Sequence, residues 1–524
     1  MVRDQPFLAL AGEVLNSSSS SREYMRGIWP RLAAMHLNTV LIPVSWEQLE
    51  PKEGQFDFTL LDGLIEDARQ NQLHLVLLWL ATWKNMVSSY APEWVRSDPH
   101  RFPLVVDKSG NRLPILSPFS ATGQAADARA FAALMKHLQQ VDGGKQTVIM
   151  VQVENEVGLP DGERDYSDVA NQAYAGPVPA QLMDYLVQHR DQLTAQLKAV
   201  WSAAGSKTSG SWEDVFGAGT ATKVLFMAWQ YARYINGVVE GGHAAYPIPL
   251  YVNAAIGRQS GLLGSYPVGG PLPLAMNVWQ AAAPRINMFS PDMYFGSVSD
   301  WCAAYTQSGN PLFIPETKGG SIGAANALLT IGAYGAIGFS PFGIDAGNSP
   351  SPELVDVYEC LRQLSPMILA HRGDGSMSAA VLNQANPTQS LELGGYTLNV
   401  ALRRERKSAE VVDLTKTSQD APQVPDQGYV LVIAEKPDRF IVAGKGVQIT
   451  FTANGTRPAV VELGKVEEGS FSSAGWVPGR RLNGDEIMLS YDLSALAAKN
   501  QTGTGLGLDS DRLTLLRVDV FRRN

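Results

Sequence analysis

The sequence has few cysteines, no long hydrophobic run and no excess of positive charge. Only 2 of its 524 residues are cysteines, Cys302 and Cys360. Two isolated cysteines provide neither a disulfide framework nor a zinc site, so we interpret both as packing residues. No run of about 18 apolar residues occurs, which argues against a membrane-spanning helix. The formal net charge of −9 argues against nucleic acid as a partner, since phosphate binding needs a basic surface.

Signals for cofactors and for export are also missing. The 7 histidines show no metal-ligand spacing. No phosphate loop or nucleotide fingerprint occurs, so we expect neither a metal nor an organic cofactor. The first residues, MVRDQPFLALAGE, contain one basic residue and run directly into a strand-like segment, unlike a secretory signal. We therefore expect a cytoplasmic protein, or a periplasmic or secreted one if a signal has been removed.

What the chain does contain is enough apolar material for a large core. Hydrophobic residues make up 45% of the sequence and charged residues 18%, which excludes a disordered chain. A chain of 524 residues favours two or more domains, or one large barrel with an accessory domain.

Up to about residue 370 the chain alternates short apolar runs with amphipathic segments. The apolar runs are nearly free of charge until they end, as is typical of parallel strands buried on both faces. The predicted strands are residues 7–11, 38–44, 73–80, 148–154, 248–254, 285–291, 311–316 and 336–342. Helical periodicity occurs at 22–35, 56–70, 126–140, 179–201, 224–239 and 352–369. This alternation predicts an α/β fold, a (β/α)8 TIM barrel over residues 1–371.

The pattern changes after residue 371. Helical periodicity fades, and strand-like runs separated by turn residues follow. These runs are residues 396–402, 428–436, 439–453, 457–469, 486–493 and 513–523. We therefore predict an all-β sandwich domain over residues 372–524.

Two glutamates lie where predicted barrel strands end. VIMVQVENEVG, residues 148–158, places Glu156 after the fourth strand, and PLFIPETKGG places Glu316 at the end of the seventh. Strand ends of a TIM barrel point into the active site. Two carboxylates that face each other across a cleft can hydrolyse a glycosidic bond. Strand alternation does not decide between Glu154 and Glu156, because the chain leaves the sheet at this point.

The residues around these glutamates resemble a known family. VQVENEVG is similar to the Q-V/I-E-N-E-Y-G motif of family 35 glycoside hydrolases of clan A, which are mainly β-galactosidases. SWEQLEPKEGQFDF, residues 45–58, resembles the W-x-x-x-E-P-x-x-G-x-F-D-F signature shared by families 35 and 42. Gly12-Glu13 also resembles the start of the family. The resemblance covers the barrel and implies a retaining mechanism.

The resemblance also implies roles for individual residues. Glu156, as the second glutamate of the motif, would be the acid/base, and Glu316 the nucleophile. Asn155 would contact the 2-hydroxyl of the bound sugar. Tyr294, in SPDMYF, would supply the aromatic hydroxyl that clan A enzymes often place near the nucleophile.

The sugar-binding wall departs from family 35. Residues 43–51, PVSWEQLEP, lack the Tyr, Asn and His of the motif Y-V-P-W-N-x-H-E-P. The third strand leads into WLATWKNMVSSYAPEW instead of the usual G-P-Y-x-x-A-E-W. We expect Trp83 to stack on a sugar, Lys84 and Asn85 to donate hydrogen bonds, and Trp46 to line the cleft. These departures indicate an atypical bacterial branch with family 42-like features, and they leave galactose specificity open.

The sequence thus predicts a retaining exo-acting β-glycosidase, with a β-galactosidase as the best candidate. Its substrate would be an oligosaccharide or a polysaccharide-derived glycan. A β-glucosidase or a transglycosylase would use the same residues. A non-catalytic carbohydrate-binding protein would be expected to lack one of the two carboxylates, and both are present. Assembly into a homo-oligomer is left open.

Overall fold

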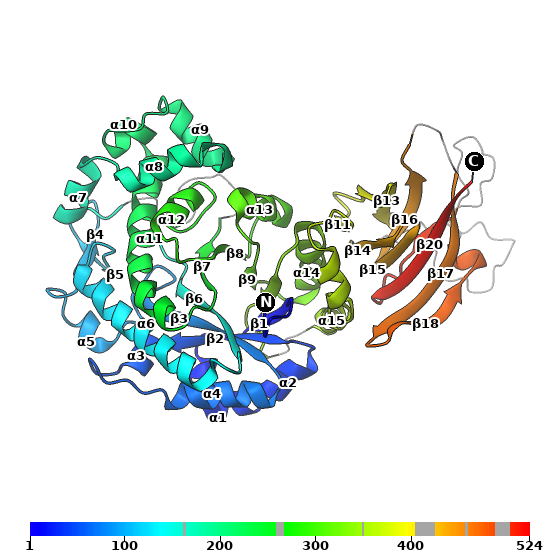
Figure 1. Cartoon of the computed structure of the whole chain (residues 1–524), viewed down its shortest axis with the longest axis horizontal. Coiled ribbons are helices and arrows are strands. Elements are labelled where there is room, and N and C mark those ends of the chain that lie inside the picture. The colour runs from blue at the N-terminus through cyan, green and yellow to red at the C-terminus, as the bar shows by residue number, and fades with distance from the viewer. Residues whose placement is uncertain are drawn as a thin grey trace, which may run out of the picture. The chain divides into compact units, whose positions relative to one another are not determined.

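The computed structural model describes residues 1–160, 164–257, 267–347, 351–403, 425–455, 460–487 and 504–523. Its elements are labelled in Figure 1. The chain forms two compact units. The first consists of Met1–Lys318 and Ala336–Ser349, and the second of Gly319–Gly335 and Pro350–Asn524.

A closed barrel of eight parallel strands forms the centre of the first unit (Figure 1). In chain order the strands are β1 (Ala9–Glu13), β2 (Thr39–Ser45), β3 (His74–Lys84), β6 (Val148–Asn155), β7 (Leu250–Ala255), β8 (Met288–Met293), β9 (Ile314–Thr317) and β10 (Gly338–Pro341). Pairing of β10 with β1 closes the sheet. All eight predicted strands are confirmed, with ends that differ by a few residues, and the predicted TIM barrel is confirmed with them.

Apolar side chains fill the interior of the barrel. Tyr251 of β7 and Phe313 meet there edge to face, with ring centroids 5.4 Å apart. The cluster around them consists of Ala9, Ala11, Leu41, Val76, Leu78, Leu80, Met150 and Met288. Because this packing closes the barrel interior, polar groups can gather only at the strand ends.

Helices surround the barrel strands within the first unit (Figure 1). They are α1 (Arg22–Arg26), α2 (Trp29–Ala34), α3 (Trp46–Leu49), α4 (Thr59–Gln70), α5 (Glu93–Arg96), α6 (Ala121–Asp142), α11 (Thr220–Ala245), α12 (Met276–Ala282) and α13 (Val298–Tyr305). The helix predicted at 22–35 is two helices, and Pro30 lies at the start of the second, where proline is well tolerated. No helix among the described residues is long and apolar enough to cross a membrane.

Between β6 and α11 the described residues form four further α-helices. They are α7 (Asp168–Ala175), α8 (Ala180–Gln188), α9 (Ala195–Ala203) and α10 (Trp212–Phe216). The single helix predicted at 179–201 is α8 and α9, which a short 3-10 turn, Arg190–Gln192, separates. A two-stranded hairpin of β4 (Leu104–Val106) and β5 (Arg112–Leu116) was not predicted.

Two antiparallel sheets make up most of the second unit. One contains β11 (Met377–Asn383), β14 (Gln427–Lys436), β15 (Arg439–Lys445), β20 (Thr514–Arg523), β17 (Val460–Ser472) and β18 (Gly475–Leu482). The other contains β12 (Thr388–Leu393), β13 (Tyr396–Leu402), β16 (Val447–Ala453) and β19 (Leu506–Gly507). Both sheets contribute to one core, which includes Leu398 and Val432. The all-β prediction is confirmed, although most of the strand predicted at 486–493 lies outside the described residues.

Two helices that follow barrel strands in the chain belong to this second unit. They are α14 (Gly320–Tyr334) and α15 (Pro352–His371). A Cβ atom on Gly332 would lie 2.8 Å from the Ala379 Cβ, so α14 approaches β11 closely at this glycine. The Tyr429 hydroxyl donates a hydrogen bond of 2.8 Å to Glu353 of α15. The predicted domain boundary between residues 371 and 372 stays a prediction, because the packing of α14 and α15 shows which elements touch and not where a domain begins.

Candidate active site

Four acidic side chains and one lysine lie at the carboxyl ends of the barrel strands. Glu13 ends β1, Lys84 ends β3, Glu156 follows β6, Asp292 lies in β8 and Glu316 in β9. Their charges act on one another, and Glu13, Asp292 and Glu316 are buried. The structure therefore brings the two glutamates predicted to be catalytic into one cluster. No group of three or more His, Cys, Asp or Glu side chains in the described ranges could hold a metal ion.

The surroundings of Glu156 favour its protonated form. Burial and the negative charge of Glu316 raise the pKa of this carboxyl to about 7. The Lys84 ammonium and a hydrogen bond with Asp292 act in the opposite direction. A carboxyl group with a pKa near neutrality can donate a proton in one step and accept one in the next.

Glu316 has a fixed hydrogen-bond donor on one oxygen. The Tyr294 hydroxyl donates to Glu316 Oε1 at 2.7 Å. Burial and the Glu316 charge raise the pKa of Tyr294 well above its usual range, so the hydroxyl keeps its proton. Glu316 Oε2 is buried and accepts no hydrogen bond from the described residues. A carboxylate held through one oxygen, with the other free to react, has the arrangement that a nucleophile needs.

Lys84 and Asn155 form a second polar pair beside the carboxyl groups. They are register partners on β3 and β6, and Lys84 Nζ donates to Asn155 Oδ1 at 3.0 Å. Asn155 Nδ2 is buried, as is Glu13 Oε1, and neither has a hydrogen-bond partner among the residues described. A buried polar atom left unpaired costs about 1–3 kcal/mol. Unpaired atoms at the strand ends are therefore expected to bind the hydroxyl groups of a ligand.

The structure distinguishes Glu154 from Glu156. The Glu154 carboxylate accepts the backbone N–H groups of Thr82 (3.2 Å) and Trp83 (2.6 Å), and it contacts Asp127 of α6. The φ angles of Glu154 and Glu156 are +61° and +47°, a left-handed conformation that costs a residue other than glycine about 1–2 kcal/mol. These two residues break the strand alternation, so Glu154 reaches the helix layer and Glu156 joins the carboxyl cluster.

The two tryptophans predicted to meet the sugar lie in the interior instead. Trp83 is 0% exposed, its indole N–H donates to the Leu116 carbonyl, and its ring packs against Tyr234 of α11. Trp46 is also fully buried and donates to Glu50 Oε2 at 2.7 Å. Neither ring is exposed to solvent, and stacking of Trp83 on a sugar and a cleft position for Trp46 stay predictions. The physical reason for the burial of Trp83 is alternation, which directs Lys84 and its neighbour to opposite sides of β3.

Asn85 is exposed and lies in the turn after β3, with a φ angle of +49°. Its role in binding sugar stays a prediction. Glu13 and Asp292 were not among the predicted site residues, although both are acids at the end of an apolar run. The same signal had identified Glu156 and Glu316, so it could have identified these two residues as well.

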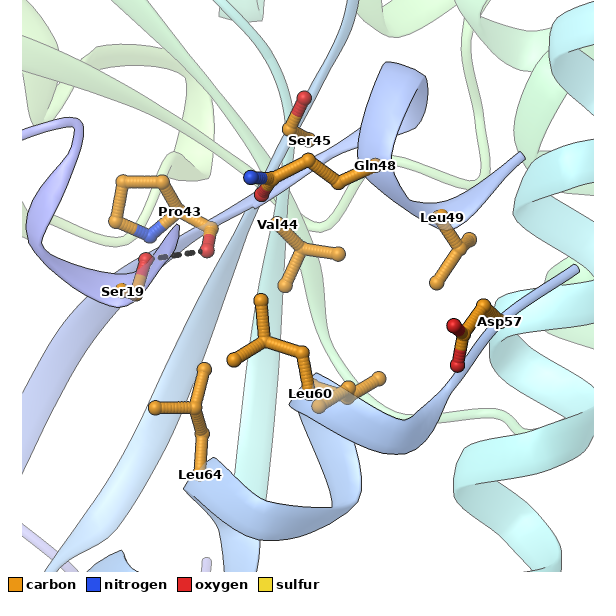
Figure 2. A pocket seen from close by; sticks show the side chains of 10 residues that line it. Ser19, Pro43, Val44, Ser45, Gln48, Leu49, Asp57, Leu60 and Leu64 are labelled. Carbon is orange, nitrogen blue, oxygen red and sulfur yellow. Dashed lines mark hydrogen bonds between the residues drawn. The ribbon is translucent and has the colours of Figure 1, made fainter. Parts of the chain in front are cut away.

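A separate pocket of about 220 Å³ lies between β2, α3 and α4. In Figure 2 the side chains of Val44, Leu60 and Leu64 converge on one another, and Ser19 Oγ donates to the Pro43 carbonyl at 2.7 Å. The remaining lining residues are Ser45, Gln48, Leu49, Asp57 and Leu61. None of the clustered carboxyl groups lines this pocket, so it is distinct from the candidate active site.

Comparison with known families adds an independent finding. Residues 16–235 match the family model described as β-galactosidase, glycoside hydrolase family 42. Residues 354–492 match a domain of unknown function, DUF5597. Among curated proteins, none matches the sequence.

Over residues 16–235 the barrel is similar to glycoside hydrolases of family 42. The match favours family 42, and the predicted membership of family 35 is not supported. The sequence motifs did not separate the two families, because the second-strand signature is common to both.

Several solved structures are similar to part of this chain. They include β-galactosidases from Bacillus circulans sp. alkalophilus (16% identity, 70% of this chain and 58% of that chain, TM-score 0.48) and from the psychrophilic Marinomonas ef1 (15%, 70% and 60%, 0.46). The catalytic domain of a Paenibacillus polymyxa β-amylase is also similar (13%, 67% and 96%, 0.46). The chain spans less than two thirds of either β-galactosidase. Similarity at this level is too low to assign an activity or a substrate.

We predict that Glu154→Ala lowers the thermal stability of the protein. The substitution leaves the N–H groups of Thr82 and Trp83 without their acceptor, at about 1–3 kcal/mol each. Thermal unfolding followed by circular dichroism measures the change. Glu23→Ala is the control, because that side chain is 73% exposed, and its loss is expected to change the midpoint little. An unchanged midpoint for Glu154→Ala would show that other contacts hold the end of β3.

Proposed function

We propose that this protein is a retaining exo-acting β-glycosidase that cleaves β-galactosides. The main support is the unequal environment of two carboxyl groups in one cluster. Glu156 has a pKa raised to about 7 by burial and by Glu316, whereas Glu316 accepts a hydrogen bond from Tyr294. Double displacement needs such a pair, one group as acid and base and the other as nucleophile. The family described as β-galactosidase supports the choice of sugar.

The reaction would proceed in two steps. Glu316 attacks the anomeric carbon while Glu156 gives its proton to the leaving oxygen, and a glycosyl ester forms on Glu316. Glu156 then takes a proton from water, the water oxygen attacks the same carbon, and the ester bond breaks. Because a lysine can only donate, Lys84 holds the Asn155 oxygen and leaves Nδ2 to bind the 2-hydroxyl of the sugar.

The carboxyl-rich cluster favours a neutral sugar. Hydroxyl groups can bond to the unpaired oxygen of Glu13, whereas a uronic acid would add a negative charge beside groups that are already buried. Glu316 is 7% exposed and Glu13 1%. Such burial suits a single terminal sugar that enters end-on, which supports exo-acting cleavage.

We predict that, among nitrophenyl galactoside, glucoside, fucoside and arabinoside, the β-galactoside is hydrolysed fastest. Retention requires the Glu156 and Glu316 carboxyl groups to lie about 5 Å apart, whereas inversion needs about 6.5–9.5 Å. Proton NMR of fresh product should therefore show the β-anomer first. The α-anomer as first product would contradict the mechanism. Products longer than the substrate would indicate a transglycosylase, and faster cleavage of the glucoside a β-glucosidase.

We predict that Glu156→Gln and Glu316→Gln each lower turnover by several orders of magnitude with little change in thermal stability. Glu156→Ala should regain turnover on an activated aryl galactoside with added azide, because that leaving group needs no acid and azide needs no base. Glu316→Ala is the matched comparison, because without the glycosyl ester azide can only displace the aryl group directly and give the α-galactosyl azide, whereas Glu156→Ala should give the β-galactosyl azide. Near-parental activity of either Gln variant would remove the assignment.

We predict that kcat/KM falls as the pH rises through about 7, because Glu156 must carry a proton and its pKa is raised to about 7. The Lys84 charge lowers this pKa, so Lys84→Met should move the alkaline limb of the profile to higher pH. Lys136→Met is the control, because Lys136 is exposed on α6. An alkaline limb that stays in place or moves to lower pH in Lys84→Met would contradict this electrostatic account.

A further inference from the structure

Asn253 of β7 links the backbone of Glu156 to Asp292. It is fully buried, its Oδ1 accepts the Glu156 backbone N–H at 2.9 Å, and its Nδ2 donates to Asp292 Oδ2 at 2.8 Å. The amide cannot be turned over, because a backbone N–H only donates and therefore requires the amide oxygen. The orientation of Asn253 is thus fixed by the chain itself.

A contact between the Asp292 and Glu156 carboxyl groups closes a ring of three residues, in which Glu156 contacts Asn253, Asn253 contacts Asp292, and Asp292 contacts Glu156. The Asp292 carboxyl lies within hydrogen-bonding reach of the Glu156 carboxyl, and Asp292 Oδ1 meets no donor among the described residues. Two carboxyl groups can share a hydrogen bond only if one of them carries a proton. Asp292 is 1% exposed, and burial followed by the charges of Glu316, Glu156 and Glu13 raises its pKa well above its usual range. These surroundings therefore favour the protonated form of Asp292.

The residue at the centre of this ring has an unfavourable backbone conformation. Glu156 has a φ angle of +47°, and a conformation of this kind persists only where its surroundings hold it. The hydrogen bond from the Glu156 backbone N–H to Asn253 Oδ1 restrains this backbone conformation directly. The ring therefore restrains both ends of Glu156, its backbone through Asn253 and its carboxyl through Asp292.

We propose that Asn253 and Asp292 are positioning residues that hold Glu156 at both ends, with Asp292 as a neutral hydrogen-bond donor to the Glu156 carboxyl. The inference rests on the proposed role of Glu156 as acid and base. Asn253 restrains the left-handed backbone from which the side chain starts. Asp292 restrains the carboxyl and stabilises its ionised form, so that the proton leaves more readily for the departing oxygen.

The other charged groups around Glu156 do not duplicate this role. The charge of Glu316 of β9 opposes its ionisation and that of Lys84 of β3 favours it, whereas burial and neighbouring charges favour the neutral form of Glu13 of β1. Glu316 and Lys84 act on the Glu156 carboxyl through their charge, whereas Asp292 acts on it through a hydrogen bond. Substitutions at Asp292 should therefore change the pH profile in a way that distinguishes a neutral donor from a further negative charge.

The test compares Asp292→Asn with Asp292→Ala. In Asp292→Asn the amide oxygen accepts from Asn253 and the amide nitrogen donates to Glu156, as the protonated aspartic acid does. We expect Asp292→Ala to lower kcat about 100-fold through misplacement of Glu156, with the alkaline limb at higher pH because the donor is lost. Asp292→Asn should restore most of that turnover and return the limb to its parental position. Asp300→Ala, in an exposed part of α13, is the control.

Asn253→Ala tests the backbone half of the ring. We expect kcat to fall about 100-fold with little change in KM, because Glu156 is displaced while the sugar contacts remain. Parental kcat in Asn253→Ala would overturn the positioning role of this residue.

Three results at Asp292 would overturn its proposed role. The first is a pH profile of Asp292→Asn whose alkaline limb lies at lower pH than that of the parent protein. This shift is expected if the substitution removes a negative charge that raised the pKa of Glu156. The second is an Asp292→Asn variant as inactive as a folded Asp292→Ala, and the third is full activity of Asp292→Ala. If Asp292→Ala does not fold, infrared difference spectra of Asp292→Asn at neutral pH decide. Loss of a protonated carboxyl band supports the proposal, and loss of a carboxylate band overturns it. Failure of the proposed function would give a different result, namely a Glu156→Gln variant that keeps its activity.

Discussion

Two hydrogen bonds from backbone N–H groups at the carboxyl end of β3 to the Glu154 carboxyl group determine the geometry of the barrel mouth. By accepting the N–H groups of Thr82 and Trp83, Glu154 joins the ends of β3 and β6 and extends β3 to Lys84. Asp127 supports this junction from α6, because it accepts the hydroxyl of Thr82 at 2.6 Å and the indole N–H of Trp79 at 2.9 Å. These bonds offset part of the cost of burying an acid and of the left-handed backbone.

The second constraint is the repulsion between carboxyl groups that share a small buried volume. Glu13 and Asp292 both have pKa values well above their usual range, first because of burial and then because of Glu316. The Lys84 ammonium acts in the opposite direction on Glu13, Glu156 and Asp292, but burial and the neighbouring acids act more strongly. These surroundings favour the protonated forms of Glu13, Glu156 and Asp292. The different roles proposed for Glu156 and Glu316 rest on their surroundings, because the two residues are the same amino acid.

Much of the barrel could be predicted from the sequence, because its strands are short apolar runs with acids at their ends. The strand predicted at 38–44 is β2, which is buried over its whole length, and the strand predicted at 148–154 is β6. The same pattern identified Glu156 and Glu316. The packing of α14 and α15 in the second unit was not predictable, because amphipathic periodicity shows that a helix has a buried face but not what covers it. The choice between families 35 and 42 required the comparison with family models.

The sequence by itself determined the fold class and the positions of acids at strand ends, because buried strands and surface helices have different periods. Only the tertiary structure decided which neighbouring residues face the site. Glu154 and Glu156 are two residues apart, and strand geometry alone would place them on the same side. Bonds to Thr82 and Trp83 direct Glu154 to the helix layer, and a bond to Asn253 fixes the backbone of Glu156. These partners come from strands far away in the sequence, so no local pattern could reveal them.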